Sequence, residues 1–529
     1  MVYRRYRAGS GPGQSPAAFD KPYYPISLRL LRVVLVLVER YYSLLITECE
    51  IFLSLIVKFL DPDKPGWQRA LALELMHRLL TQPRLLTEFC RYYDCQPHAT
   101  NIFQDMINSL GAYVQNMFVS VVAVGEAGQG AGPGNSAPPS LLAGLPVGPG
   151  SSAQPGFFYR GVFQPVVGGG WVGGAARSPH LDTTDRLEPG PLQEGYGVSL
   201  AYSCLLDAVR SVGLVVDTPQ EGDEEVASLD AVRAQLLRSS WCGLLAAMAL
   251  LLDAATEEST AESILQAMVL FSSLAGRLGL FKLRDSFITA VCKASLPPHY
   301  TLTVLKATAS TQVVSGGAGA GGRGGEGDEG GEGGDPRHQV VAVGTPLPTA
   351  SLPAAAQQGP VMLTAKNLQC MRSLLGLAHC HGSLLDTSAW LPVLTTLQHL
   401  VWILGLRPGQ GGQLRPARPS AETSAVLTTA VLADLPVLAG MLSSLFESSG
   451  GLGEGSLTAL VAGLVTISRE ALQLADTSRE PSLFALAKLL ETGLANLHRV
   501  ELIWQPVTQH LLEASRYNHL TSVLNEFSG

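Results

Sequence analysis

Apolar residues that recur at helical spacing, with turn residues between the segments, constrain the fold of this chain more than any other feature. In one segment Trp67, Leu71 and Leu75 follow at intervals of four, which places them on one helix face. Residues 259–262, Ser-Thr-Ala-Glu, form a capping-box pattern that predicts the start of another helix. Alternation of apolar and polar residues, which is typical of strands, is limited to the brief stretch 338–343. The sequence therefore predicts an all-α fold, an armadillo/HEAT-type α-solenoid with long Gly/Pro-rich disordered loops.

Stretches rich in glycine and proline interrupt the helical pattern and set the expected domain boundaries. Residues 315–334 contain twelve glycines in twenty positions, and such a stretch cannot support a core, so we expect an exposed loop. Helix is expected to dominate residues 25–118, 196–305 and 362–512. The expected organisation, in chain order, is a disordered tail at 1–20, a helical block at 21–119, a Gly/Pro-rich linker at 120–195, a helical repeat block at 196–310, a Gly-rich acidic loop at 311–360, and a helical repeat block at 361–529 that is truncated at its end.

The charge balance of the chain argues against a nucleic-acid-binding protein. There are 36 lysines and arginines against 44 aspartates and glutamates, a net charge of -8, whereas such proteins usually carry a basic excess. The eight cysteines are thinly spread, no Asn-x-Ser/Thr acceptor occurs, and no apolar run directly follows the basic residues at the start. Because secreted domains usually show the opposite features, we expect a cytoplasmic protein.

Two apolar stretches are candidates for membrane spans, and neither fits a span of about 20 mostly apolar residues. Residues 44–60 carry three charged side chains, and residues 242–252 are uncharged but too short. Residues 241–254 are apolar nearly all round, so we expect a buried core helix there. Peripheral membrane contact stays open, because the arginines among residues 1–7 could touch acidic lipid, although a solvated tail is favoured.

No convergent set of residues for catalysis or nucleotide binding is visible. Gly319 and Gly321 match part of a dinucleotide fingerprint, but a phosphate cradle needs a strand before it and a helix after it, so a linker is favoured. Trp241, Trp402 and Trp504 are interpreted as core residues, because buried tryptophans are more often core than ligand platforms. We therefore expect no catalytic residues and no cofactor-binding residues.

Cysteine and histidine spacings do not favour a metal site. His379, Cys380 and His381 are consecutive, and adjacent helical residues point about 100° apart, so they cannot converge on one tetrahedral zinc ion. The favoured interpretation is the end of a helix, with Gly382 as its C-terminal cap. The cysteines within residues 90–95 lack a second cysteine pair. We therefore expect no metal-binding residues.

Six long segments together carry a resemblance to a known family. They lie at residues 41–74, 241–258, 276–300, 361–382, 396–406 and 480–504, and the first reads YYSLLITECEIFLSLIVKFLDPDKPGWQRALALE. The chain looks like the Mon-two homologs, the monensin-sensitivity proteins of Golgi and endosome traffic, which are similar to the large Arf guanine-nucleotide exchange factors. Residues 21–119 resemble the upstream homology region of those factors. The resemblance implies an armadillo/HEAT-like scaffold, cytoplasmic and peripheral on trans-Golgi and endosomal membranes.

The same resemblance implies protein partners and a function. The implied partners are a Dopey-family protein, a phospholipid flippase and an Arf-like GTPase, with peripheral membrane contact and with neither nucleic acid nor a small-molecule substrate. The expected function is a non-enzymatic scaffold in vesicle-mediated protein transport, with endosome-to-Golgi sorting. Alternatives are an Arf-type exchange factor, a regulator of Arf-like GTPases, or a helical adaptor of another compartment. An exchange factor needs a catalytic domain of about 200 residues, whereas only about 75 separate the first two helical blocks here.

Two departures from the family pattern predict a fragment or a truncated gene model. The family has an additional N-terminal dimerisation region, which is missing before residue 20, and it continues well beyond the point where this chain stops. Residues 513–529 leave the family pattern.

Overall fold

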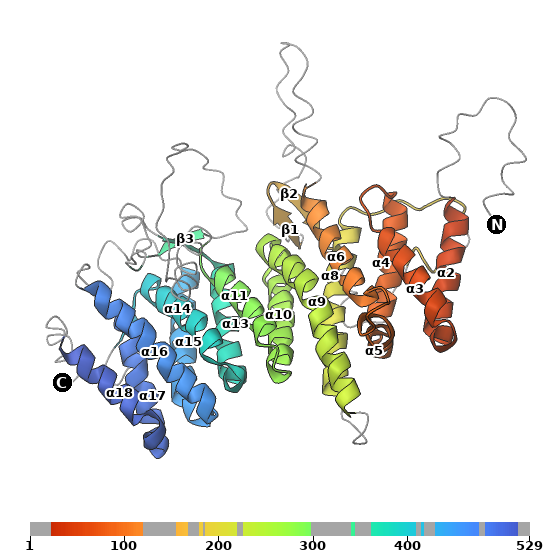
Figure 1. The fold of residues 1–529 in the computed structure, drawn as a ribbon. Helices are drawn as coiled ribbons and strands as arrows, with labels where there is room; N and C mark the ends of the chain where they lie inside the picture. The colour runs from red at the N-terminus through yellow and green to blue at the C-terminus, as the bar shows by residue number, and fades with distance from the viewer. Residues whose placement is uncertain are drawn as a thin grey trace, which may run out of the picture. The chain divides into compact units, whose positions relative to one another are not determined.

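The fold is largely helical in the residues that the computed structural model describes. These are residues 23–119, 155–167, 179–183, 186–218, 226–297, 340–343, 347, 361–408, 414–416, 429–475 and 482–516. The chain forms two compact units: unit 1 comprises Met1–Gly134 and Gln164–Ser211, and unit 2 comprises Asn135–Phe163 and Val212–Gly529. The boundary between them falls inside one helix, α8 (Tyr196–Asp217) (Figure 1).

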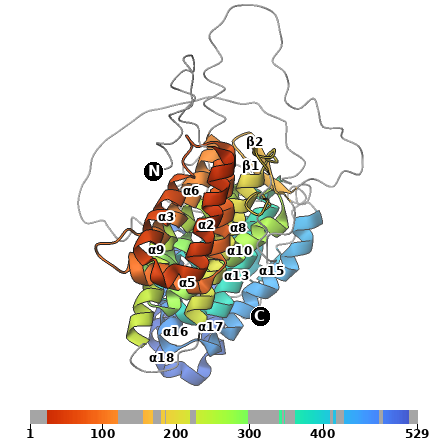
Figure 2. The ribbon, with the colours of Figure 1, turned by 90° about the vertical axis from the view of Figure 1, so that its right-hand side faces the viewer.

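Unit 1 consists of helices that pack side by side. In chain order they are α2 (Tyr24–Tyr41), the 3-10 turn η3 (Tyr42–Leu44), α3 (Ile46–Lys58), α4 (Gly66–Leu80), α5 (Pro83–Phe89), the π turn η4 (Cys90–Asp94), α6 (Ile102–Val119) and the first part of α8. Helix α2 packs on α3 and α4, and α3 packs on α6 (Figure 2). Leu28, Leu31 and Leu35 of α2 are buried because their spacing of three and four places them on one helix face.

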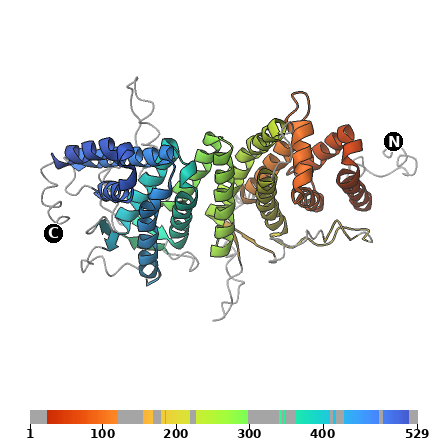
Figure 3. The ribbon, with the colours of Figure 1, turned by 90° about the horizontal axis from the view of Figure 1, so that it is seen from below.

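Unit 2 stacks its helices on near neighbours in the sequence (Figures 1 and 3). Its long helices are α9 (Val226–Ala254), α10 (Glu258–Arg277), α11 (Phe281–Ser295), α13 (Ala365–His381), α14 (Thr387–Ile403), α15 (Thr429–Glu447), α16 (Glu454–Ala475), α17 (Phe484–Ala495) and α18 (Val500–Ser515). Helix α10 packs on α11, α11 on α13 and α14, α14 on α16, and α16 on α17 and α18. This layered packing is that of an α-solenoid, so the predicted fold class is confirmed.

Helix caps are set by side chains that the sequence pattern only partly identified. The capping box expected at residues 259–262 is wrong, because α10 begins at Glu258 and its N-cap makes no side-chain hydrogen bond. A capping box is instead present at the start of α13. There the Asn367 backbone N–H donates to Thr364 Oγ1 at 3.2 Å, and the Thr364 N–H donates to Asn367 Oδ1 at 2.9 Å. Such a cap contributes about 1 kcal/mol.

Short antiparallel strand pairs accompany the helices. They are β1 (Gly156–Tyr159) with β2 (Val162–Pro165), β3 (Val340–Val343) with β4 (Val361–Thr364), and β5 (Leu406–Pro408) with β6 (Leu414–Pro416). Strand β3 lies within the stretch 338–343 that showed alternation, whereas the sequence did not predict the others. The strands β1 and β2 lie in the stretch 120–195, where we expected a linker. The predictions for residues 1–20 and 315–334 lie outside the described residues.

The structure corrects the argument that residues 242–252 are too short to span a membrane. These residues belong to α9, which has 29 residues. Among the described residues, Tyr196–Asp217, Leu229–Ala254 and Glu454–Gln473 are long and apolar enough to cross a membrane by length and composition. Helix α9 packs on α10 and α11, and only one of its sides is buried. Leu244 is buried, whereas Cys242 is exposed. Its packing within unit 2, and not its length, is therefore the argument for a core helix.

We predict that alkaline carbonate releases the protein from cell membranes. Leu244, Met248 and Leu251 of α9 are at most 1% exposed in the folded protein, and a membrane span would remove α9 from α10 and α11. The measurement is fractionation of the tagged protein into supernatant and pellet, with an integral and a peripheral membrane protein as controls. Retention in the pellet together with the integral control would contradict the assignment of α9 to the core.

Candidate interaction surfaces

The cysteine and histidine motifs do not come together with other ligands in the part of the chain that is described. Within that part, no group of three or more histidine, cysteine or carboxylate side chains could hold a metal ion. On α13, Cys380 is exposed, and His379 Nδ1 lies 3.2 Å from Ser448 Oγ, which accounts for that histidine without a metal. The glycine motif at residues 319–321 lies outside the described residues.

Gly382 follows α13, as expected, but close packing and not a left-handed backbone explains the glycine. Its φ is -56°, which any residue can adopt, and it begins the 3-10 turn η5 (Gly382–Leu384). A Cβ atom at this position would lie 2.9 Å from Leu452 Cδ2 and 3.3 Å from the Trp390 ring. The absent side chain lets η5 approach α14 and the turn before α16.

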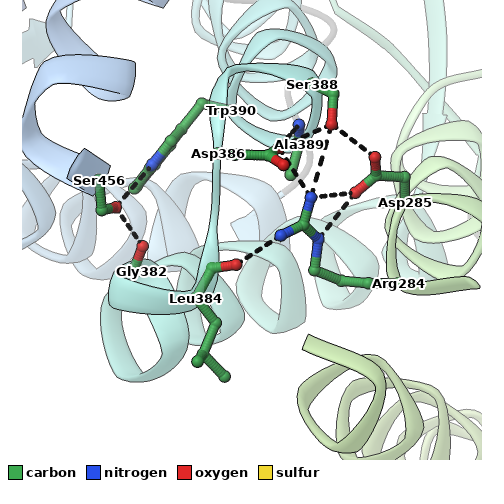
Figure 4. Close-up of polar contacts among 9 residues, drawn as sticks. All are labelled: Arg284, Asp285, Gly382, Leu384, Asp386, Ser388, Ala389, Trp390 and Ser456. Atoms are coloured by element: carbon green, nitrogen blue, oxygen red, sulfur yellow. Dashed lines mark hydrogen bonds and ion pairs between the residues drawn. The ribbon is translucent and has the colours of Figure 1, made fainter. Parts of the chain in front are cut away.

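A buried guanidinium joins α11 to the start of α14 in unit 2 (Figure 4). Arg284 of α11 is 1% exposed. Its Nη1 donates to the Leu384 carbonyl at 2.5 Å, its Nη2 to Asp386 Oδ1 at 2.7 Å, and its Nε to Asp285 Oδ1 at 2.8 Å. A buried charge is tolerated only when it is paired and hydrogen-bonded. The cluster therefore fixes the position of η5 against α11.

Asp386 has a second task, because it is the N-cap residue of α14. Its Oδ1 accepts from the Ala389 N–H at 3.2 Å and from Ser388 Oγ at 2.6 Å. Burial by itself would raise the pKa of Asp386, but hydrogen bonds from Ser388 and Arg284 outweigh it and hold the pKa below its usual range. The carboxylate therefore stays ionised at neutral pH, and it accepts hydrogen bonds both from the arginine and from the N-terminus of α14.

A second short hydrogen-bonded chain connects α14 to α16. Trp390 Nε1 donates to Ser456 Oγ at 3.1 Å, and Ser456 Oγ donates to the Gly382 carbonyl at 2.5 Å (Figure 4). Trp390 is completely buried, so its indole N–H needs such a partner. Together with the Arg284 cluster, these two hydrogen bonds connect α11, α14 and α16 of unit 2. The polar side chains involved therefore stabilise the packing of these helices.

We predict that Arg284→Ala lowers the free energy of unfolding by about 3 kcal/mol, because it removes a buried side chain, leaves the Leu384 carbonyl without its side-chain donor and takes from Asp386 its charged partner. The matched control is Arg277→Ala. Arg277 lies 2.7 Å from Asp217, and both side chains are well exposed, so the loss there should be about 1 kcal/mol or less. Urea unfolding followed by circular dichroism measures both. Equal losses in the two variants would contradict the structural role of Arg284.

In unit 1 a buried carboxylate attaches part of the expected linker to α4. Glu74 is 1% exposed. It accepts from the His180 N–H at 3.1 Å, from the Leu181 N–H at 2.7 Å and from the Tyr196 hydroxyl at 2.5 Å. Burial raises the pKa of Glu74, and the bonds from Tyr196 and the backbone offset this only in part. Residues 179–183 are thus held by specific contacts, which glycine content alone did not indicate.

The turn before α6 contains a second buried carboxylate of unit 1. Asp94, at the end of η4, accepts from the Phe103 N–H at 3.0 Å and from the Gln104 N–H at 3.1 Å, at the start of α6. The preceding Tyr93 donates its hydroxyl to the Ile46 carbonyl at 2.6 Å. These contacts join η4, α3 and α6. Asp94 precedes Ile102, the first residue of α6, by eight positions, so no local capping pattern in the sequence indicates these bonds.

An exposed apolar surface lies on α2, η3 and α3 of unit 1. We call it the N-terminal face; it consists of Leu30, Val33, Val36, Tyr41, Leu44, Ile51 and Leu55. Leu30 is 57% exposed and Val33 is 55% exposed. Monomeric proteins rarely expose large contiguous apolar patches unless these bind something. The face is therefore a candidate interaction surface.

A second exposed apolar surface lies at the other end of the described sequence, on α17, the turn η8 (Leu497–Arg499) and α18. We call it the C-terminal face; it consists of Leu490, Leu494, Leu497, Val500 and Trp504. The prediction that Trp504 is buried is wrong, because its side chain is 61% exposed. Its neighbours Ile503 and Val507 occupy the buried side of α18. Trp241 and Trp402 are half-buried.

The comparisons with known proteins bear on these surfaces. Residues 17–102, which include α2 to α5 and thus the N-terminal face, match the Sec7-like_HUS family model, described as Mon2/Sec7/BIG1-like, HUS domain. The "Protein MON2 homolog" of Homo sapiens is 46% identical over 97% of this chain, and that of Drosophila melanogaster is 45% identical over 98%. The resemblance to the Mon-two homologs is confirmed. The chain spans 31% of the length of each of these Mon2 relatives.

Proposed function

We propose that this chain is a non-enzymatic helical scaffold in membrane trafficking between the late Golgi and endosomes, with a role in endosome-to-Golgi protein sorting. The observation that carries the proposal is the 46% identity with the human MON2 homolog over 97% of this chain. The match of residues 17–102 to a Mon2/Sec7/BIG1-like domain supports the same class. The proposed location is the cytoplasmic side of trans-Golgi and endosomal membranes, to which the protein binds peripherally.

The physical features of the chain are those of a scaffold. The buried polar side chains Arg284, Glu74 and Asp94 are committed to backbone and side-chain partners within their own units. The exposed features are apolar faces at helix surfaces, and apolar faces are what protein partners recognise. The proposed partners are a Dopey-family protein, a phospholipid flippase and an Arf-like GTPase.

A second candidate function is nucleotide exchange on Arf-type GTPases. The description of the matched family model includes Sec7 alongside Mon2. Exchange requires groups held rigidly toward the phosphates and magnesium of the nucleotide. A GTPase can bind a helical surface without such groups, so binding without exchange is consistent with the scaffold proposal.

We predict that this chain does not accelerate nucleotide release from Arf or Arf-like proteins, and that affinity purification recovers the three proposed partners. The measurements are release of a fluorescent nucleotide and recovery of partners on the tagged chain.

Leu497→Ser with Trp504→Ser, at the C-terminal face, should lower recovery of at least one partner several-fold. The control is Glu501→Gln with Gln505→Ala, which changes exposed polar neighbours only. Strong acceleration of release, abolished by changing one acidic residue, would instead favour the exchange factor.

A further inference from the structure

Two cysteine side chains lie in contact at the turn between α5 and α6 of unit 1. The Sγ atoms of Cys90 and Cys95 are 3.8 Å apart. Cys90 begins the π turn η4 and Cys95 is its C-cap residue, and the Cys95 N–H donates to the Cys90 carbonyl at 2.8 Å. A hydrogen bond over five positions, where an α-helix has four, places these two residues next to each other along the turn. The backbone itself therefore brings the two sulfur atoms together.

The backbone of η4 also meets the requirement for a disulfide bond. A disulfide needs its two Cα atoms about 4.4–6.8 Å apart. The Cα atoms of Cys90 and Cys95 are separated only by a carbonyl, the 2.8 Å hydrogen bond and an N–Cα bond. With standard bond lengths this path keeps them less than about 7 Å apart. The sulfur atoms can thus bond after side-chain rotation, without unfolding of the turn.

The two thiols differ in their access to solvent. Cys95 is exposed, whereas Cys90 is completely buried. An exposed thiol beside a second thiol is the arrangement of redox-sensitive cysteines, in which the first sulfur meets the oxidant and the second sulfur attacks the product. In this pair Cys95 is the thiol that meets the oxidant, and Cys90 is the thiol that follows.

The surroundings of the thiols set how fast they react, because the thiolate is the reactive form. Burial raises the pKa of Cys95, while the hydrogen bond with Cys90 and the charge of Arg91 oppose the rise. Burial also raises the pKa of Cys90, and the neighbouring Cys95 and Asp94 add to the rise. Both thiols are therefore mostly protonated at neutral pH, so the pair responds to sustained oxidant and not to a brief pulse.

The residues between the two cysteines hold neighbouring helices. Tyr93 donates its hydroxyl to a carbonyl at the start of α3, and Asp94 accepts from two backbone N–H groups at the start of α6. A bond between the two sulfur atoms closes a covalent ring that contains Tyr93 and Asp94. The ring limits the motion of both side chains relative to the helices that they contact.

We propose that Cys90 and Cys95 form a reversible disulfide bond when the protein meets hydrogen peroxide. The Cys95 thiolate attacks one peroxide oxygen, the O–O bond breaks, and a sulfenic acid and hydroxide form. The Cys90 thiolate then attacks the Cys95 sulfur, the S–S bond forms and a second hydroxide leaves. The two thiol protons convert both hydroxides to water. The two thiols together lose two electrons, and the peroxide gains them.

The proposed bond makes the turn before α6 sensitive to the redox state of its surroundings. A dithiol reductant reverses it by thiol–disulfide exchange. The inference goes beyond the proposed function and does not depend on it, because both cysteines and the contacts of the turn lie within unit 1.

Trypsin offers a direct test, because it cleaves after Arg91, between the two cysteines. The reduced full chain is treated with hydrogen peroxide, its remaining thiols are blocked, and it is digested without a reductant. We expect mass spectrometry to find the peptide 85–91 joined to the peptide that begins at Tyr92, and dithiothreitol to separate them. This measurement uses the unchanged chain, so it does not depend on whether a variant folds.

Single substitutions test the order of the two steps. In Cys90→Ala the sulfenic acid at Cys95 has no second thiol to react with, so labelling of Cys95 by dimedone should rise several-fold. Cys95→Ser should abolish the joined peptides and leave the buried Cys90 unlabelled. The matched control is Cys242→Ser on α9, which removes another exposed thiol and should still give the joined peptides. Circular dichroism checks that each variant is folded.

Four outcomes would overturn the inference. They are the absence of joined peptides after peroxide treatment, equal dimedone labelling of Cys95 with and without Cys90, loss of the joined peptides in Cys242→Ser, and a bond that links two copies of the chain on a non-reducing gel. Each of these leaves the scaffold proposal in place, because none of them concerns partners or location in the cell.

Discussion

Each helix of this protein can bury its apolar side only against another helix, and the rest of the structure depends on this constraint. The described strands have three or four residues each and form only two-stranded pairs, so no sheet offers a core of its own. In a stack of helices, every layer is covered by the next one. The helices at the edge of a stack are covered on one side only. The N-terminal and C-terminal faces are helix sides that stay exposed among the residues that the structure describes.

Polar contacts between helices add specificity to this packing. Apolar faces alone would allow neighbouring helices to slide or rotate with little change in buried area. Arg284 and Trp390 prevent this in unit 2, because each donates hydrogen bonds in fixed directions to groups on another element. Glu74 has the equivalent role in unit 1, where it holds residues 179–183 on α4. The surfaces available to partners therefore lie on supports whose geometry is well defined.

The helices could be predicted from the sequence because their periodicity repeats over many residues, whereas several other features have no such signal. Strands such as β1 are too short for alternation to be recognised. Trp504 was interpreted as a core residue because buried tryptophans are more often core than ligand platforms. On α18, however, it lies one position, a rotation of about 100°, from the buried Ile503. The cap at Thr364 was missed because its partner is Asn367 in place of a glutamate or glutamine. The Arg284 cluster joins residues distant in sequence, which no local pattern reports.

The distance along the chain between the two sides of the Arg284 cluster has a consequence for sequence evolution. Arg284 is 100 residues from Leu384 and 102 from Asp386, and the Gly-rich residues 315–334 lie between them. The entropic cost of joining two anchors rises only logarithmically with the intervening length, by about 0.6 kcal/mol for each doubling. Insertions and deletions confined to the Gly-rich stretch are therefore expected to be nearly neutral for stability. We therefore expect the length of this stretch to vary during evolution, whereas Arg284 and Asp386 are expected to be retained because their contact depends on both side chains.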